Sequence, residues 1–333
     1  MKVLIAGGAG YIGSTVASAC LDAGITPVIL DNLSTGRIEF TQGRIFYHGD
    51  IADAELIDKI FAEHPDIDAV VHAAALIVVP ESVEQPLRYY RENVAKSVDF
   101  IDHLLRNGVT RYLFSSSGSI YAPGPDLTVD ESSPLAPTNP YSRSKVMMEQ
   151  VLEDATVASK LRAISLRYFN PIGADPQLRS GLQSRRPTHL LGRLLTAVEN
   201  DEEFEITGVD WPTRDGTGIR DYIHVWDLAQ AHVRALERFD EVIPPGSDRR
   251  YEVINLGTGS GTTVREFIAA FEAATGTKVR VREAGRRPGD FIGWHTRSQK
   301  ARELLGWTTQ LSIEDGIRDS QRWSAVRDQR LAA

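Results

Sequence analysis

The sequence has one cysteine and no long apolar run, and these absences exclude several classes of protein. Because Cys20 stands alone, the chain cannot form an intrachain disulfide. No apolar stretch approaches the roughly twenty residues that a membrane-spanning helix needs, so we expect no membrane segment. The net charge is -8 without any basic stripe, so nucleic acid is not an expected partner. The chain begins in a strand-like run at Lys2 without a basic and apolar leader, which predicts a cytoplasmic protein.

Internal repeats and low-complexity tracts are absent too, and short apolar runs instead alternate with amphipathic stretches. The run at 69–71 is wholly apolar, which is typical of a strand buried on both faces of a sheet. Helical stretches between such strands indicate a parallel sheet, so the pattern predicts a doubly wound α/β fold. The predicted strands cover residues 3–6, 27–30, 44–47, 69–74, 112–116 and 163–169.

A glycine-rich run, GGAGYIG (7–13), follows the first predicted strand and opens a helix. Gly7 permits a tight turn, Gly10 allows the backbone to approach a pyrophosphate, and Gly13 allows the helix to pack close to the sheet. Asp31 ends the second strand, at the distance expected for a carboxylate that binds a ribose 2′-hydroxyl. A carboxylate there would repel a 2′-phosphate, so the motif predicts NAD rather than NADP, although Arg37 lies close in sequence. The other expected cofactor contacts are Tyr11, Ile12, Asn32, Asp50, Ile51, Ala73 and Ala74.

The second half of the chain has a looser pattern, rich in Gly, Pro and Arg. We therefore expect a NAD-binding Rossmann domain at 1–170 and mainly a smaller substrate lobe at 171–333, with residues near 220–260 returning to the first domain. The elements predicted here are helices at 188–199 and 264–274 and a strand at 252–255.

Tyr141 and Lys145 lie four residues apart at the start of a predicted helix, and therefore on one face of it. A free tyrosine, with a pKa of about 10, is a poor base at neutral pH. A neighbouring ammonium favours the phenolate, so we expect Lys145 to lower the pKa of Tyr141 and make it a general base. Ser117 ends a predicted core strand and is placed to donate to the reacting oxygen, whereas Ser115 and Ser116 are expected to satisfy a turn.

The glycine motif, Ser117 and the Tyr141–Lys145 pair together resemble the extended short-chain dehydrogenase/reductase superfamily. Further runs resemble the UDP-glucose (UDP-galactose) 4-epimerases, and the resemblance covers nearly the whole chain. These runs are PLRYY (86–90), RYFNP (167–171), DGTGIRDYIHV (215–225), NLG (255–257) and RRPGD (286–290).

The resemblance implies a reaction in which a tyrosine takes the proton of the sugar 4-hydroxyl while NAD accepts the C4 hydride. The resulting 4-keto sugar turns over in the site and receives the hydride on its other face. Tyr141 then matches the base, Lys145 the residue that tunes it, and Ser117 their hydrogen-bond partner. The resemblance also places Ser119 at a second active-site hydroxyl, and Asn93 and Phe169 beside the cofactor. His72 and His224 are interpreted as structural, and no metal is implied.

The UDP half of the substrate is implied to meet Asn170, Arg220, Arg287 and Asp290. Arginines suit the diphosphate and a carboxylate suits ribose hydroxyls. Arg185, Arg186, His189 and Leu190 are expected around the substrate. The family resemblance of two long helices, at 86–107 and 140–159, further implies a homodimer.

Two runs depart from the epimerase pattern, and a third position bears on substrate size. Ile77 stands where these enzymes commonly carry a lysine, and Thr188-His189 replaces an Asn-Asn pair, so the sugar neighbourhood is expected to differ. Trp294 falls at a position thought to limit substrate size, and its ring is expected to disfavour N-acetylhexosamines.

Three other functions were compared with a UDP-glucose/UDP-galactose 4-epimerase. A 4,6-dehydratase is disfavoured because Gly118 and Ser119, not acids, follow Ser117. Epimerisation of UDP-glucuronate to UDP-galacturonate remains open, since Arg179, Arg185 or Arg186 would suit a C6 carboxylate. A non-catalytic NAD-binding regulator on the same fold also remains open, although it would need no tyrosine base.

Overall fold

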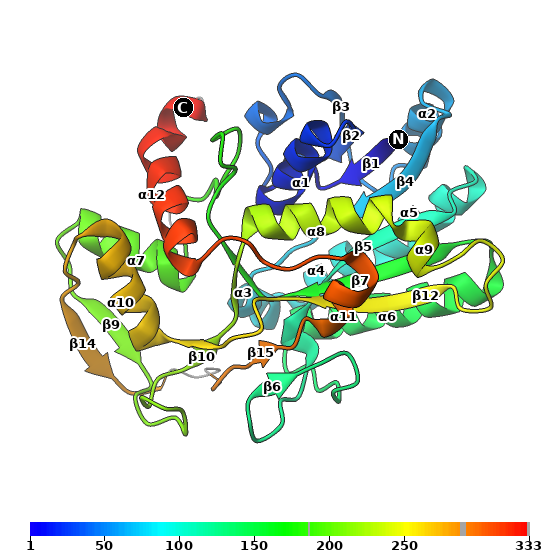
Figure 1. The fold of residues 1–333 in the computed structure, drawn as a ribbon. Coiled ribbons are helices and arrows are strands. Elements are labelled where there is room, and N and C mark those ends of the chain that lie inside the picture. Colours follow the sequence, from blue (N-terminus) through cyan, green and yellow to red (C-terminus); the bar gives the residue numbers. More distant parts are fainter. Residues whose placement is uncertain (186, 287–290, 332–333) are drawn as a thin grey trace.

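The computed structural model describes residues 1–185, 187–286 and 291–331. A seven-stranded parallel sheet forms its centre, in the order β12-β7-β5-β4-β1-β2-β3 (Figure 1). All six strands predicted in the first half lie in this sheet, which confirms the doubly wound fold. The strands are β1 (Lys2–Ala6), β2 (Thr26–Asp31), β3 (Ile45–His48), β4 (Ile67–His72), β5 (Arg111–Ser117), β7 (Arg162–Tyr168) and β12 (Tyr251–Leu256).

Helices cover both faces of the sheet, and each face has its own apolar core. On one face, α1 (Tyr11–Asp22) and α8 (Val225–Glu237) pack on the strands, and Cys20 is fully buried there. On the other face lie α2 (Ala54–Glu63), α5 (Lys96–Arg106) and α6 (Pro140–Ala158). Strands buried on both sides explain the wholly apolar run in β4.

The helix predicted at 86–107 is interrupted. It consists of α4 (Pro86–Tyr90), a π-helical segment (Arg91–Ala95) and α5, which ends at Arg106. π-Helical turns are uncommon and frequently mark functional positions. Apolar periodicity cannot reveal one extra residue in a turn, so the prediction of a single regular helix was wrong at this point.

The smaller lobe lies beyond the carboxyl end of the sheet (Figure 1). Its parallel strands β9 (Phe204–Thr207) and β14 (Val281–Ala284) pair with each other, and α7 (Leu190–Glu199), α10 (Val264–Thr275) and α12 (Ile313–Arg330) share one apolar cluster with β9. Two predicted elements of this half, α7 and α10, lie within two residues of their expected bounds. The third, β12, lies beside β7 in the main sheet.

Short strands connect the two parts of the molecule. β8 (Asn170–Ile172) pairs with β11 (Tyr222–His224), β10 (Ile219–Arg220) with β13 (Thr262–Thr263), and β6 (Thr128–Val129) with β15 (His295–Thr296). Among the described helices, none is long and apolar enough to cross a membrane. The remaining helices are α3 (Val79–Glu84), α9 (Phe239–Val242) and α11 (Gln299–Leu305), with 3-10 turns at Ile38–Thr41 and Gly118–Ile120.

Candidate active site

The turn between β1 and α1 has the shape that the glycine motif predicts. Gly7 has a φ of +80°, and a Cβ atom there would lie 2.5 Å from the backbone nitrogen of Ala74. A Cβ on Gly13 would lie 2.2 Å from the Gly7 carbonyl oxygen, so only glycine lets α1 approach the turn. A Cβ on Gly10 would come no closer than 3.4 Å to the Gly7 carbonyl oxygen, its nearest neighbour, so there is room for a ligand at the N-terminus of α1.

Asp31 lies next to this turn at the carboxyl end of β2. Its carboxylate accepts hydrogen bonds from the backbone N–H groups of Ala9 at 3.0 Å and Leu33 at 2.8 Å. Burial nevertheless raises the pKa of Asp31 above its usual value, although the side chain keeps 8% exposure. A fixed carboxylate beside a glycine turn and a free helix N-terminus fits the ribose and pyrophosphate of NAD.

Most of the other expected cofactor contacts surround the same turn. Asp50 accepts hydrogen bonds from Lys96 Nζ at 2.8 Å and from Asn32 Nδ2 at 3.2 Å, so it is held close to Asp31. The Tyr11 phenol donates to the carbonyl oxygen of Gly173 at 2.7 Å. We therefore expect Tyr11 to contact the cofactor through its backbone and not through its phenol. The remaining members follow β3 or β4 or begin α1: Ile12, Ile51, Ala73 and Ala74.

Asn93 lies in the π-helical segment and is 3% exposed. Its carboxamide accepts from the Leu76 N–H at 2.8 Å and donates to the Leu76 carbonyl at 2.9 Å and to Ser144 Oγ at 3.2 Å. The side chain thus fixes the loop after β4, which carries Ala73 and Ala74, to helix α6. Ile77, where the family commonly carries a lysine, is next in this loop and is 63% exposed.

Helix α6 positions the tyrosine–lysine pair. Asn139 accepts a hydrogen bond from the Ser142 N–H at 2.9 Å, and Pro140 occupies the first turn, so the helix begins just before Tyr141. Lys145 is 4% exposed, and its Nζ donates to the Ser115 carbonyl at 2.7 Å and lies 5.9 Å from the Tyr141 ring centroid. The structure brings the pair to the carboxyl end of β5, where Ser117 lies.

The expected lowering of the tyrosine pKa is wrong for this structure. Burial raises the pKa of Tyr141, and a hydrogen bond with Ser117 offsets only part of that rise. Lys145 carries its own burial cost, which lowers its pKa to about 8 although the charge of Glu149 opposes the change. Sequence spacing predicted the ammonium next to Tyr141 but not the low-dielectric surroundings that both groups share.

Three hydroxyl groups connect Ser117 to helix α6. The oxygen of Ser119 lies 2.9 Å from that of Ser117 and 2.9 Å from that of Ser142. Two aromatic side chains enclose this turn. A Cβ on Gly118 would lie 2.5 Å from the Phe169 ring, and Trp294 Nε1 donates to the Gly118 carbonyl at 2.8 Å. Phe169 and Trp294 therefore both pack against the turn that follows Ser117.

Arg220 lies on the short strand β10, and Asn170 lies on β8, which pairs with β11, the strand just after β10. The Asn170 N–H donates to the carbonyl of Asp221 at 3.0 Å, immediately after Arg220. The Arg220 guanidinium lies 4.2 Å from the centroid of the Phe291 ring and donates to the Ile292 carbonyl at 3.1 Å. Arg220 thus lies against the residues that directly follow the RRPGD run (286–290). Three of the predicted substrate contacts lie outside the described residues: Arg186, Arg287 and Asp290.

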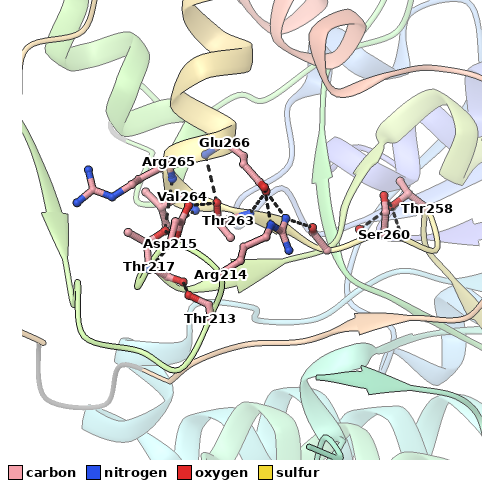
Figure 2. A network of polar contacts seen from close by, with 11 residues as sticks. Thr213, Arg214, Asp215, Thr217, Thr258, Ser260, Thr263, Val264, Arg265 and Glu266 are labelled. Carbon is pink, nitrogen blue, oxygen red and sulfur yellow. Dashed lines mark hydrogen bonds and ion pairs between the residues drawn. The ribbon is translucent and has the colours of Figure 1, made fainter. Parts of the chain in front are cut away.

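A network of polar contacts fixes the segment before Arg220 to the start of α10 (Figure 2). Asp215 accepts from the Thr217 N–H at 2.9 Å and from Thr217 Oγ1 at 2.7 Å, and its other oxygen accepts from Thr263 Oγ1. Thr217 Oγ1 in turn accepts from the Val264 N–H at 3.1 Å. The first residues of the DGTGIRDYIHV run therefore serve the fold by setting the position of the strand that carries Arg220.

The sequence and the fold both match known proteins along nearly the full chain. Residues 3–257 match the NAD dependent epimerase/dehydratase family. The chain belongs to this family.

Named relatives narrow the comparison within the NAD dependent epimerase/dehydratase family. The chain is 43% identical to UDP-glucose 4-epimerase of Azospirillum brasilense, over 98% of this chain and 93% of the relative. It is 40% identical to UDP-glucose 4-epimerase of Bacillus subtilis, over 98% and 97% of the two chains. The crystal structure of UDP-glucose-4-epimerase from Stenotrophomonas maltophila, with bound NAD and formylated UDP-arabinopyranose, superposes with a TM-score of 0.92 at 35% identity, covering 99% of both chains.

Two of the three arginines considered for a C6 carboxylate are engaged away from Ser117. Arg179 forms ion pairs with Asp22 of α1 at 2.7 Å and with Asp175 at 2.6 Å. Arg185 lies 3.3 Å from Asp328 near the end of α12. The nearby His189 accepts from the Gly192 N–H at 3.2 Å and so caps α7, and Leu190 begins that helix. The sequence indicated arginines in this stretch but not their direction.

Both histidines predicted to be structural have structural partners. His72 is 1% exposed, bonds to the Tyr112 hydroxyl and lies among aromatic rings, and burial lowers its pKa to about 3. His224 caps α8 by accepting from the Trp226 N–H at 3.0 Å.

A buried acid close to the tyrosine–lysine pair was not predicted from the sequence. Glu149 lies eight residues after Tyr141 and is 5% exposed. Ser116, expected to satisfy a turn, instead donates to Glu149 Oε1 at 2.5 Å. The spacing could have predicted it, because positions four and eight residues after Tyr141 fall on the same face of the helix, which places Glu149 beyond Lys145.

Proposed function

We propose that this chain is an isomerase that inverts C4 of a UDP-hexose with NAD as its cofactor, and that UDP-glucose and UDP-galactose are its substrates. The observation that carries the proposal is the position of Ser117, Tyr141 and Lys145 at the carboxyl end of β5, in a family member whose full-length relatives are UDP-glucose 4-epimerases. A regulator that only binds NAD would not need a half-buried tyrosine beside a buried lysine.

Tyr141 acts as the base that removes the proton of the sugar 4-hydroxyl and later returns it. Ser117 hydrogen-bonds to Tyr141 and offsets part of the rise in its pKa, and the Lys145 ammonium, 5.9 Å from the ring centroid, would favour the phenolate once the proton is removed. NAD, when bound, would supply the hydride acceptor and, on its oxidised nicotinamide ring, a positive charge. Inversion requires the 4-keto sugar to turn over, so that the opposite face of C4 receives the hydride while the C4 oxygen stays within reach of Tyr141. The hexose must therefore be held loosely while its UDP is held firmly.

The UDP contacts are proposed to come from the smaller lobe and its connecting strands. Arg220 and Arg287 would pair with the diphosphate, and Asp290 would bind ribose hydroxyls. Asn170 on β8 would also contact the UDP half of the substrate. Trp294 is fixed to Gly118 and would limit the space beside the hexose. Since Arg179 and Arg185 pair with aspartates elsewhere, a hexose without a C6 carboxylate fits the described residues better than a glucuronate.

A two-substrate assay tests the proposal. The purified protein is incubated with UDP-glucose and, separately, with UDP-glucuronate, and the 4-epimers are resolved by chromatography. We expect UDP-glucose to convert to a mixture with UDP-galactose. Conversion of the acid alone would replace the hexose assignment with the UDP-glucuronate/UDP-galacturonate reaction, and conversion of neither would refute the epimerase assignment.

The assembly and the division into domains are proposed along with the activity. We expect a homodimer formed by the helical run 86–106 and α6, on which Val98 and Met147 are more than a third exposed. The NAD-binding part would comprise 1–170 with residues from about 220–260, and the substrate lobe most of 171–333. A cytoplasmic location stays a prediction.

A further inference from the structure

Beneath the catalytic pair lies a buried carboxylate that the proposed reaction does not use directly. Glu149 follows Lys145 by one helical turn on α6 and is 5% exposed. Its two carboxylate oxygens accept a paired hydrogen bond from the Arg167 guanidinium on β7, with the Nε contact at 2.9 Å. Arg167 is itself 5% exposed, so this ion pair is almost fully removed from water.

The same carboxylate joins helix α6 to the strand that carries Ser117. Ser116 Oγ donates to Glu149 Oε1 at 2.5 Å. Ser116 lies in β5 between Ser115, whose carbonyl accepts from Lys145, and Ser117, which hydrogen-bonds to Tyr141. Three successive residues of β5 are therefore tied to three positions of α6 spaced four residues apart.

A chain of hydrogen bonds leads from the ion pair toward the segment that carries Trp294. Arg167 Nη1 donates to the Tyr121 hydroxyl at 2.6 Å, and that hydroxyl donates to Asn255 Oδ1 at 2.7 Å. Asn255 Nδ2 then donates to Thr296 Oγ1 at 2.9 Å, two residues after Trp294. A buried, fully hydrogen-bonded network of this kind holds its members in one arrangement.

The charged groups around Lys145 leave Glu149 as the acid that acts on it. Glu149 on α6 and His72 on β4 interact electrostatically with Lys145, whose Nζ lies 5.9 Å from the Tyr141 ring centroid. On β7, Arg167 pairs with Glu149 and Tyr168 interacts with Tyr141. His72 is neutral, since burial and Lys145 lower its pKa to about 3, and the pKa of Tyr168 is raised by burial. Within the described residues, Glu149 therefore supplies the negative charge that opposes the loss of the Lys145 proton.

We propose that Glu149 is a positioning residue of the active site, which holds the Tyr141–Lys145 face of α6 against the end of β5 and keeps Lys145 charged. The proposal rests on the proposed function for its kinetic consequences, whereas its effect on Lys145 is measurable in any folded protein. Arg167 balances the charge of Glu149, and Ser116 transmits its position to Ser117.

Two variants separate the charge of Glu149 from its attachment to β5. Glu149→Gln removes the charge, and Ser116→Ala removes the attachment while the ion pair stays. For Glu149→Gln we expect kcat to fall about 10- to 100-fold with KM for the UDP-sugar changed less than about twofold. The basic limb of the kcat–pH profile should move down by about one pH unit or more. For Ser116→Ala we expect a loss of about three- to tenfold in kcat with the basic limb unmoved.

Matched controls exist on neighbouring strands. Glu252 of β12 is 2% exposed and pairs with Arg249 and Lys300, so Glu252→Gln removes an equally buried charged acid away from α6. Ser165 of β7 is fully buried and lies 2.8 Å from the Tyr251 hydroxyl, so Ser165→Ala removes a comparable buried hydroxyl. Both controls should keep the wild-type pH profile and change kcat less than about twofold.

A titration that needs no turnover completes the test. With 13C-labelled lysine, the Cε signal of Lys145 is assigned by its absence from Lys145→Arg, and its midpoint is expected near 8 in the wild type and lower by about one unit or more in Glu149→Gln. An unchanged midpoint in folded Glu149→Gln, or Ser116→Ala kinetics equal to those of Ser165→Ala, would overturn the proposal. If Glu149→Gln does not fold, Ser116→Ala decides, and a wild type without epimerase activity but with the expected titration refutes only the proposed function.

Discussion

Tyr141 is the residue on which the proposed chemistry depends. Replacing it with phenylalanine removes the proton acceptor and leaves the ring and the glycine turn in place, so we expect kcat to fall about 100- to 10,000-fold. NAD content, measured after denaturing the purified variant, should equal that of the wild type. Tyr89→Phe is the control for the loss of a buried phenol, because Tyr89 is fully buried and its hydroxyl bonds to Val78 and Glu81. Wild-type turnover by Tyr141→Phe would refute the assignment of the base.

Trp294 is the residue that we expect to restrict the sugar. Its indole N–H is held by the Gly118 carbonyl, so the ring is fixed beside Ser117 and does not readily give way to an N-acetyl group. Trp294→Ala should raise kcat/KM for UDP-N-acetylglucosamine relative to UDP-glucose by about tenfold or more. The control is Trp226→Ala, which removes a half-buried tryptophan beside Arg179. The same ratio in Trp294→Ala and wild type would exclude Trp294 as the limit on substrate size.

At the scale of elements, α12 depends on the acid that caps it. Asp315 accepts hydrogen bonds from the Ser312 N–H at 2.9 Å and from the Ser312 hydroxyl at 2.8 Å. These two bonds lower the pKa of Asp315 from 3.8 to about 2. Because the folded-state pKa is depressed, the stabilisation is present above about pH 4 and is lost as the pH falls toward 2. Asp315→Asn should lower the Tm by about 2–4 °C at pH 7, and the difference from wild type should disappear near pH 2.

Asp328→Asn is the matched control for this cap, since Asp328 lies on the same helix but caps nothing. Its Tm at pH 7 should stay within about 1–2 °C of the wild type. Equal Tm values for Asp315→Asn and the wild type at pH 7 would show that the hydrogen bonds between Asp315 and Ser312 do not stabilise α12.

The elements differ in how far their sequences predict them. The central strands were predictable because an apolar run bounded by Gly or Asp has one stable place, inside a parallel sheet. Gly7 and Asp31 were predictable because a dinucleotide turn needs those two residue types at that spacing. The strand pairs β6–β15 and β10–β13 were not, since two residues carry no periodicity and their partners lie far along the chain. Glu149 was missed for a related reason, because its partner Arg167 belongs to another element.

At the scale of the whole molecule, the exposed apolar residues of the long helices predict a dimer. Val98 on α5 and Met147 on α6 are 42% and 40% exposed. Light scattering coupled to size exclusion should give twice the chain mass of 36.8 kDa. The double variant Val98→Glu and Met147→Glu should shift the mass to that of one chain, because it puts like charges into the contact. Val157→Glu at the end of α6, also exposed, is the control expected to remain dimeric.

The central claim is that one site removes a hydride from C4 of a UDP-hexose and returns it to the same carbon, with NAD held throughout. The most direct measurement incubates the purified enzyme, without added NAD, with UDP-glucose that carries deuterium at C4, and follows the label by mass spectrometry and NMR. We predict that both epimers form and that the deuterium stays on C4 of each. Loss of the label to water or to an added pool of NAD, or a need for added NAD before any UDP-galactose forms, would contradict the claim.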